Sequence, residues 1–339
     1  MKLASTISSK EEEDDSQMRH YIFLGQKYFK CYQCIMNRKK SWGGKWTEEK
    51  LDAFEKYVKA YLTIMNTRRD ACGWKLLYFD GFAGSGSRNL EEEKEEVEYA
   101  ADLFGQEVTI EDFNVYQGAA ERVVKIEGDS VRSFDHFYFV DKNEANCKAL
   151  EERLANYETT GKKHYMPMNA NVAVKMLSGT LRKYGNCKAL AFLDPFGMQI
   201  DWTSIESLKD LPVDLWILVP TGVIINRLLE RKVDQEKGLT HAEKLESFFG
   251  MTETEIKSFF YIEKPVQTLF GEEEIITKAE NSIRRIAQLY VKRLQDVFPY
   301  VTEDPMVLYN THNIPIFHLV FAAKNKTAMK IAQEIINKQ

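Results

Sequence analysis

Short apolar runs alternate along this chain with longer stretches in which apolar and polar residues mix at helical spacing. Such short runs predict buried strands, and apolar positions three or four residues apart predict amphipathic helices. The predicted strands are 75–79, 137–140, 164–168, 189–193 and 213–219. Strands separated by helices favour a parallel, doubly wound α/β sheet.

Helical periodicity is clearest just before the first predicted strand. Thr47 is expected to be the N-cap of this helix. Its apolar face comprises Leu51, Phe54, Val58, Tyr61, Leu62 and Met65. Further helices are expected at 118–124 and 142–150, and the region 224–298 reads as mostly helical.

The chain closes with two apolar runs, 306–309 and 316–322, whose polar connection predicts an antiparallel hairpin. A closing hairpin on a parallel sheet resembles the arrangement in class I methyltransferases. The predicted fold class is therefore α/β, with a Rossmann-like class I methyltransferase sheet, the closing hairpin and helical insertions. The predicted organisation is a partly disordered N-terminal extension over 1–41 and one domain over 42–339, with insertions at about 87–117 and 225–298.

The composition narrows the classes of function. A net charge of -5 and a pI near 5.8 argue against a broadly basic nucleic-acid-binding surface, so a local patch or a partner would have to hold any nucleic acid. No apolar run is long enough to span a bilayer. The acidic run 11–15 stands where a signal peptide needs an apolar core, so we expect a cytoplasmic protein without a membrane partner.

The cysteines do not predict a metal site. The five are scattered, which is typical of a reducing compartment. Cys31 and Cys34 form a C-x-x-C pair that would supply half of a zinc site, but no second pair has suitable spacing. A pair of thiols without metal is therefore favoured. The patterns of zinc and serine hydrolases are also absent from the sequence.

The most informative segment is the glycine-rich loop after the first predicted strand. Asp80-Gly81-Phe82-Ala83-Gly84-Ser85-Gly86 places an acid at the strand end and two spaced glycines behind it. Glycine allows a tight turn and lets the backbone approach a ligand closely. The loop predicts a binding site for a nucleotide-like cofactor at the carboxyl edge of the sheet, with a purely structural turn as the alternative.

Two features of this loop argue against a cofactor rich in phosphate. The third glycine of a dinucleotide-binding loop is missing, and no P-loop lysine follows. The next segment is acidic instead, which suits phosphate poorly. S-adenosylmethionine carries a positive sulfonium and no phosphate, so it fits better. The predicted cofactor-binding residues in the loop are Asp80, Phe82, Gly84 and Gly86.

Three further polar residues follow predicted strands. Asp141, after the second strand, is placed to accept hydrogen bonds from a ribose diol, although an ordinary helix N-cap is the alternative. Asn169 and Asn171, after the third strand, are candidates for contact with the adenine ring.

The fourth predicted strand ends in Asp194-Pro195-Phe196-Gly197. This segment resembles the Asp/Asn-Pro-Pro-aromatic turn with which amino-methyltransferases hold a target amine. There the acid and a proline-fixed carbonyl accept the two N–H bonds, and the aromatic ring stacks on a flipped base. In this chain Phe196 stands in place of the second proline. A strand-ending turn without catalytic function is the alternative.

From about Trp42 to its end, the chain resembles the three-Cys-motif partner (TcmP) family. The shared segments are Trp42-Gly43-Gly44-Lys45-Trp46-Thr47, Asp80 to Gly86, Gly118-Ala119-Ala120, Leu193 to Gly197, Asn226-Arg227 and Pro315 to Ala322. Family members usually have leucine where this chain has Gly81, so a looser turn is expected. The resemblance implies a methyltransferase-like protein that works with a separately encoded three-Cys-motif protein.

The sequence therefore predicts an S-adenosylmethionine-dependent methyltransferase. Asp194, Pro195 and Phe196 would orient an acceptor amine, with a nucleic-acid base as one candidate substrate. The rival hypothesis is a catalytically inactive methyltransferase-like platform that binds a partner protein. A dinucleotide oxidoreductase is disfavoured by the missing third glycine.

Overall fold

The computed structural model describes residues 45–86, 118–126, 131–195, 197–230, 238–268, 271–310 and 312–339. These residues all belong to one compact unit, 43–339. The predicted extension 1–41, the predicted insertion 87–117, and the residues Cys31, Cys34 and Phe196 lie outside the described residues.

The fold is mixed α/β with a mostly parallel central sheet, and it is compatible with a Rossmann-like fold. The strands of the sheet are β1 (Lys75–Asp80), β2 (His136–Asp141), β3 (Lys162–Pro167), β4 (Cys187–Leu193), β5 (Val213–Val219), β8 (Tyr300–Val301), β9 (Met306–Tyr309) and β10 (Pro315–Ala323). Their order is β3-β2-β1-β4-β5-β10-β8, and β9 also pairs with β10. Strands β1 to β5 are parallel, whereas β10 runs antiparallel to β5.

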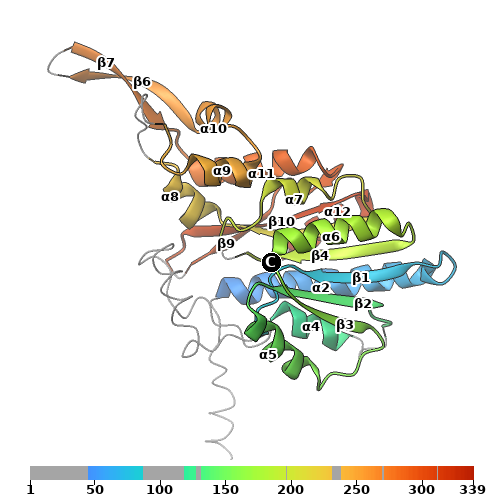
Figure 1. Cartoon of the computed structure of the whole chain (residues 1–339). Coiled ribbons are helices and arrows are strands. Elements are labelled where there is room, and N and C mark those ends of the chain that lie inside the picture. Colours follow the sequence, from blue (N-terminus) through green and yellow to red (C-terminus); the bar gives the residue numbers. More distant parts are fainter. Residues whose placement is uncertain are drawn as a thin grey trace, which may run out of the picture. The chain divides into compact units, whose positions relative to one another are not determined.

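Helices connect the strands and cover the sheet. They are α2 (Lys45–Arg69), α4 (Ala119–Lys125), α5 (Glu144–Leu154), α6 (Ala170–Lys183), α7 (Trp202–Glu206), the π-helix η4 (Thr221–Ile225), α8 (Asn226–Leu228), α9 (Ala242–Phe249), α10 (Glu253–Phe260), α11 (Ser282–Gln295) and α12 (Lys326–Ile336). In Figure 1, α6 and α7 lie on one side of the central strands, and α2, α4 and α5 lie on the other. None of the helices in the described part of the chain has the length and apolar composition needed to cross a bilayer.

Most predicted elements are confirmed. All five parallel strands and the hairpin β9–β10 are present, although β3 begins two residues earlier than predicted. One capping prediction is wrong, because α2 already includes Lys45, so Thr47 lies inside the helix.

The prediction of a mostly helical region over 224–298 is also wrong in part. Strands β6 (Tyr261–Thr268) and β7 (Gly271–Lys278) form an antiparallel two-stranded sheet within it. In Figure 1 these two strands extend beyond α9 and α10, away from the central sheet. The sequence of β6 contains Glu263, Lys264 and Pro265, and that of β7 contains Glu272 to Glu274. Neither segment therefore shows the continuous apolar run from which a strand is predicted.

Aromatic packing attaches α2 to the sheet. Phe54 is 1% exposed, and its ring stacks on Phe192 of β4 with centroids 4.2 Å apart. One turn further along the helix, Tyr57 packs edge-on against Trp216 of β5, and its hydroxyl donates a hydrogen bond to Asp214 at 2.7 Å. The apolar face predicted for this helix is therefore its buried face, and it holds α2 across β4 and β5.

Phe54→Ala should lower the free energy of unfolding by about 3–5 kcal/mol, because it removes a fully buried ring and leaves a cavity against Phe192. Ile64→Ala on the same helix is the matched control, since Ile64 is 46% exposed and its loss should change stability by less than about 1 kcal/mol. Urea unfolding followed by circular dichroism measures both variants. Equal losses in the two variants would contradict the packing described for α2.

Candidate functional site

The strand order reverses between β1 and β4, and this point locates the candidate site. From β1 the sheet continues to β2 and β3, whereas from β4 it continues to β5 and β10. In open α/β sheets, ligands bind outside the carboxyl ends of the strands at such a switch point. Asp80 is the last residue of β1, and Asp194 is the first residue after β4. The structure therefore brings together the two strand-end acids that the sequence singled out.

Asp80 lies beneath the glycine loop rather than on its surface. The side chain is buried, with Oδ1 accepting a hydrogen bond from the Phe82 backbone N–H and Oδ2 accepting one from the Tyr78 hydroxyl, both at 3.2 Å. Burial, together with the charge of nearby Asp194, raises the pKa of Asp80 to about 7 despite these hydrogen bonds. Asp80 thus fixes the turn of the loop and holds a carboxyl group that titrates near neutral pH.

Asp194 forms an ion pair that the sequence analysis did not predict. Its Oδ2 accepts a hydrogen bond from Lys50 Nζ of α2 at 2.5 Å. The Lys50 side chain is only 5% exposed, and Nζ also lies 5.1 Å from the centroid of the Trp46 ring. A buried ammonium group needs a negative partner, and Asp194 supplies it. Among the described residues no hydrogen bond reaches Oδ1 of Asp194, so one carboxylate oxygen is available to a ligand.

The glycine loop bends at Gly84 and Gly86, which have φ values of +59° and +84°. No atom of the described residues lies within 4 Å of where a Cβ would stand at Gly84, so the backbone here faces open space. The Ala83 N–H donates to the carbonyl of Val140 at 2.9 Å, which ties the loop to the end of β2. The loop therefore runs along the edge between Asp80 and Asp141, with a face that a ligand can approach.

A backbone hydrogen bond joins the two residues that flank the predicted insertion 87–117. The Gly118 N–H donates to the carbonyl of Gly86 at 2.9 Å, and α4 begins at the next residue. Gly86 and Gly118 are therefore neighbours in space, and α4 follows the loop in space although not in sequence. A Cβ at Gly81 would stand 2.4 Å from the Leu193 side chain, so the backbone here lies close to the end of β4, and the looser turn expected at Gly81 stays a prediction.

Asp141 lies beside this loop, at the end of β2. Its Oδ1 accepts hydrogen bonds from the Asn143 backbone N–H at 2.7 Å and from the Asn146 amide at 3.3 Å. The N-cap of α5 is Asn143, so the alternative that Asp141 is a helix cap is wrong. Binding of a ribose diol by Asp141 stays a prediction.

Asn169 and Asn171 both have structural partners. Asn169 is the N-cap of α6 and accepts from the Asn171 N–H at 2.8 Å. The Asn171 amide donates to the Gln199 carbonyl at 2.9 Å and accepts from the Asp201 N–H at 2.9 Å. These bonds hold the segment between β4 and α7, and contact of either amide with an adenine ring stays a prediction.

The remaining predicted site residues are Pro195 and Phe196. Pro195 is buried directly after Asp194, and Phe196 lies outside the described residues. Within the described ranges no group of three His, Cys, Asp or Glu side chains is placed to hold a metal ion.

Lys50 is a residue of the candidate site that was not predicted from the sequence. It stands among the polar positions of an amphipathic helix, where lysine is usually solvated. The spacing of Trp46 and Lys50, one helical turn apart, shows that the two share a face, but it does not show which strand end that face meets.

No protein-family model matches this chain, and no curated protein matches it. Among solved structures, a Legionella pneumophila strain Philadelphia 1 protein described by the family model DUF519 is similar at 15% sequence identity, with a TM-score of 0.37. That match covers 84% of this chain and 98% of the other. A similarity of this size does not bear on the function of this chain.

Asp80→Asn should change how stability depends on pH. The folded pKa of about 7 lies above the ordinary value of 3.8, so the folded state binds the proton more tightly than the unfolded state does. The stability contributed by protonated Asp80 is present below about pH 4 and is lost as the pH rises toward 7. Relative to Asp80→Asn, the wild type should therefore lose up to roughly 4 kcal/mol over this range.

Urea unfolding at several pH values measures this difference. Asp304→Asn is the control, because Asp304 is exposed and belongs to another part of the fold. A difference between wild type and Asp80→Asn that stays constant from pH 4 to pH 8 would contradict the raised pKa of Asp80.

Proposed function

We propose that this protein is an S-adenosylmethionine-dependent methyltransferase with a class I methyltransferase sheet, related to the TcmP family. The observation that carries the proposal is the meeting of Asp80, the glycine loop and Asp194 at the switch point between β1 and β4. The closing antiparallel strand β10 and its partner β9 also agree with this kind of sheet.

In this proposal the cofactor lies along the loop from Asp80 to Gly86, with its ribose near Asp141. S-adenosylmethionine supplies a methyl group on a positively charged sulfur, so transfer depends on alignment more than on a strong base. The open backbone at Gly84 leaves room for a ligand, and the carboxylate of Asp141 suits its hydroxyl groups. Asp80 is buried beneath the loop, and its carboxyl group favours a ligand of positive charge when it is ionised. Asn169 and Asn171 border the adenine end.

The acceptor is held from the opposite side of the switch point. Asp194 accepts an N–H of the target amine through Oδ1, while Lys50 fixes Oδ2 and with it the orientation of the carboxylate. Pro195 shapes the turn, whereas stacking of Phe196 on the acceptor stays a prediction, because this residue lies outside the described part of the chain. An exocyclic amine of a nucleic-acid base fits this arrangement, and a separately encoded three-Cys-motif protein would help to present it.

A second candidate function is supported by the same ion pair. In this second function, Asp194 serves only as the partner of the buried Lys50 ammonium group and accepts no N–H from a target amine. The chain is then an inactive platform for a partner protein. The two functions differ in cofactor binding and in methyl transfer, so both can be tested.

Isothermal titration with S-adenosylmethionine should give micromolar binding, with proton release at pH 7. Burial raises the pKa of Asp80 to about 7, so its carboxyl group is partly protonated there, and a cationic ligand nearby favours the carboxylate form. Titrations in two buffers of different ionisation enthalpy measure the released fraction, which should decrease as the pH is raised from 7 to 9. Asp80→Asn should release none. A folded chain that binds no S-adenosylmethionine would favour the platform, and binding of NAD in its place would favour an oxidoreductase.

Asp194→Asn should reduce methyl transfer by at least about a hundredfold, while S-adenosylmethionine affinity changes by less than about threefold. The amide keeps the shape of the side chain but loses the charge that orients the amine and pairs with Lys50. A radiolabelled-methyl assay over RNA, DNA and protein acceptors measures transfer. Full activity of Asp194→Asn would contradict the role assigned to Asp194. The control is Asp201→Asn, because Asp201 lies in the same segment between β4 and α7.

A further inference from the structure

A pocket of about 630 Å³ lies at the opposite edge of the sheet from the candidate site. Its lining includes the first residue of each of three neighbouring parallel strands: Lys75 of β1, His136 of β2 and Lys162 of β3. Because β1 is six residues long, its two ends are about 17 Å apart. This pocket is therefore distinct from the edge that carries Asp80 and Asp194.

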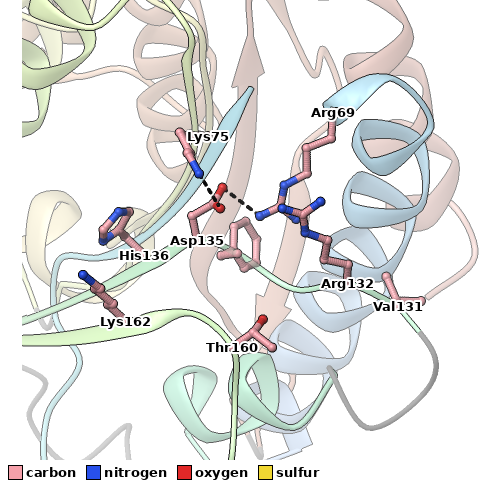
Figure 2. Close-up of a pocket in the computed structure, with 9 residues that line it drawn as sticks. Arg69, Lys75, Val131, Arg132, Asp135, His136, Thr160 and Lys162 are labelled. Atoms are coloured by element: carbon pink, nitrogen blue, oxygen red, sulfur yellow. Dashed lines mark hydrogen bonds and ion pairs between the residues drawn. The ribbon is translucent and has the colours of Figure 1, made fainter. Parts of the chain in front are cut away.

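The pocket is rich in positive charge. Arg69, Lys75, Arg132 and Lys162 line it, and Asp135 is the one carboxylate among its lining residues. Figure 2 shows Lys75, His136 and Lys162 on one side of Asp135, and Arg69 and Arg132 on the other. The chain as a whole has a net charge of -5, so this positive cluster is a local feature.

Asp135 is already occupied by the protein itself. Its Oδ2 accepts from Arg69 at 2.7 Å and from the Leu76 backbone N–H at 2.7 Å, and Lys75 Nζ lies 3.4 Å from Oδ1. Partial burial alone would raise the pKa of Asp135, but these hydrogen bonds and charges outweigh burial and lower it. Arg69 is itself only 2% exposed, so this pair forms a fixed part of the wall.

The other cationic groups are accessible to a ligand. Lys162 is exposed and makes no ion pair with the described residues. The Lys75 side chain is 55% exposed, and its hydrogen bond to Asp135, at 3.4 Å, is longer than the bonds that Asp135 accepts from Arg69 and Leu76. Arg132 is 49% exposed, and its partner Asp70 is a surface residue at 85% exposure. An exposed ion pair of this kind contributes little free energy, so an incoming anion can compete with Asp70 for Arg132.

His136 adds a fixed polar ring to the same wall. Its Nδ1 lies 3.0 Å from Nε2 of His164, and the two rings stack with centroids 5.3 Å apart. The ring is thereby held in place at the edge of the sheet, between Lys75 and Lys162 (Figure 2).

We infer that this pocket binds the phosphate groups of a nucleotide, either free or as part of a single-stranded nucleic acid. Cationic side chains from β1, β3 and the segment before β2 surround one opening, an arrangement that suits an anion of more than one charge. The volume exceeds what a lone phosphate needs and lies within the usual range for small-molecule sites. None of the residues that line this pocket belongs to the proposed methyltransferase site.

The test measures binding of two probes to the full chain at low salt. ADP represents a free nucleotide and is followed by isothermal titration, and a fluorescein-labelled single-stranded RNA is followed by anisotropy. At least one probe should bind. Lys75→Ala combined with Lys162→Ala should weaken it by at least about tenfold, since two charge-assisted contacts are lost.

The matched control is Lys326→Ala combined with Lys330→Ala, which removes two exposed lysines from α12 and should change affinity by less than about twofold. Binding of ADP alone would indicate a free nucleotide. Binding of RNA with a salt slope that becomes shallower in the Lys75/Lys162 variant would indicate a nucleic-acid strand. Failure of both probes to bind, or an equal loss in the control, would overturn the inference. Titration of the same variants with S-adenosylmethionine tests the proposed function separately. Failure of one proposal can therefore be distinguished from failure of the other.

Discussion

The packing of α2 on β4 and β5 is the interaction on which the candidate site depends. Phe54 and Tyr57 bury their rings against Phe192 and Trp216, and this contact sets the position of the first turns of the helix. Those turns carry Lys50, whose ammonium group meets Asp194 at the end of β4. A shift of α2 along the sheet would leave a buried charge without its partner, so the hydrophobic contact and the ion pair require the same register.

Parallel strands give the two edges of this sheet opposite chemistry. Asp80 and Asp141 end neighbouring strands, and Asp194 follows β4, so carboxylates gather at one edge. Lys75 and Lys162 begin strands of the same sheet, and with Arg132 they make the other edge positive. A chain that is acidic overall can therefore present a cationic pocket, because the lysines stand at the beginnings of these parallel strands and the acids at their ends; the cationic pocket is shown in Figure 2.

Much of the fold could be predicted because the central strands β1, β4 and β5 are buried along nearly their whole length and read as apolar runs. Strand β6 escaped prediction because it pairs with β7 through backbone hydrogen bonds and carries charged residues, with no apolar period to mark it. The strand-end acids Asp80, Asp141 and Asp194 were predictable for a related reason, since polar residues stand out directly after apolar runs. Lys50 and the pocket at Lys162 gave no such signal, because lysine at a helix surface or a strand start is ordinary.

The sequence by itself determined the parallel strands, the glycine loop and the acids at the strand ends, since each is specified by residues that are neighbours along the chain. The tertiary structure alone decided that Asp80 is buried with a raised pKa, that Asp194 pairs with Lys50, and that Lys75, Arg132 and Lys162 share one pocket. Lys50 and Asp194 are 144 positions apart, and only the packing of a helix on a sheet brings such residues within hydrogen-bonding distance. Local patterns specify elements, whereas burial and charge pairing arise from contacts that no local pattern contains.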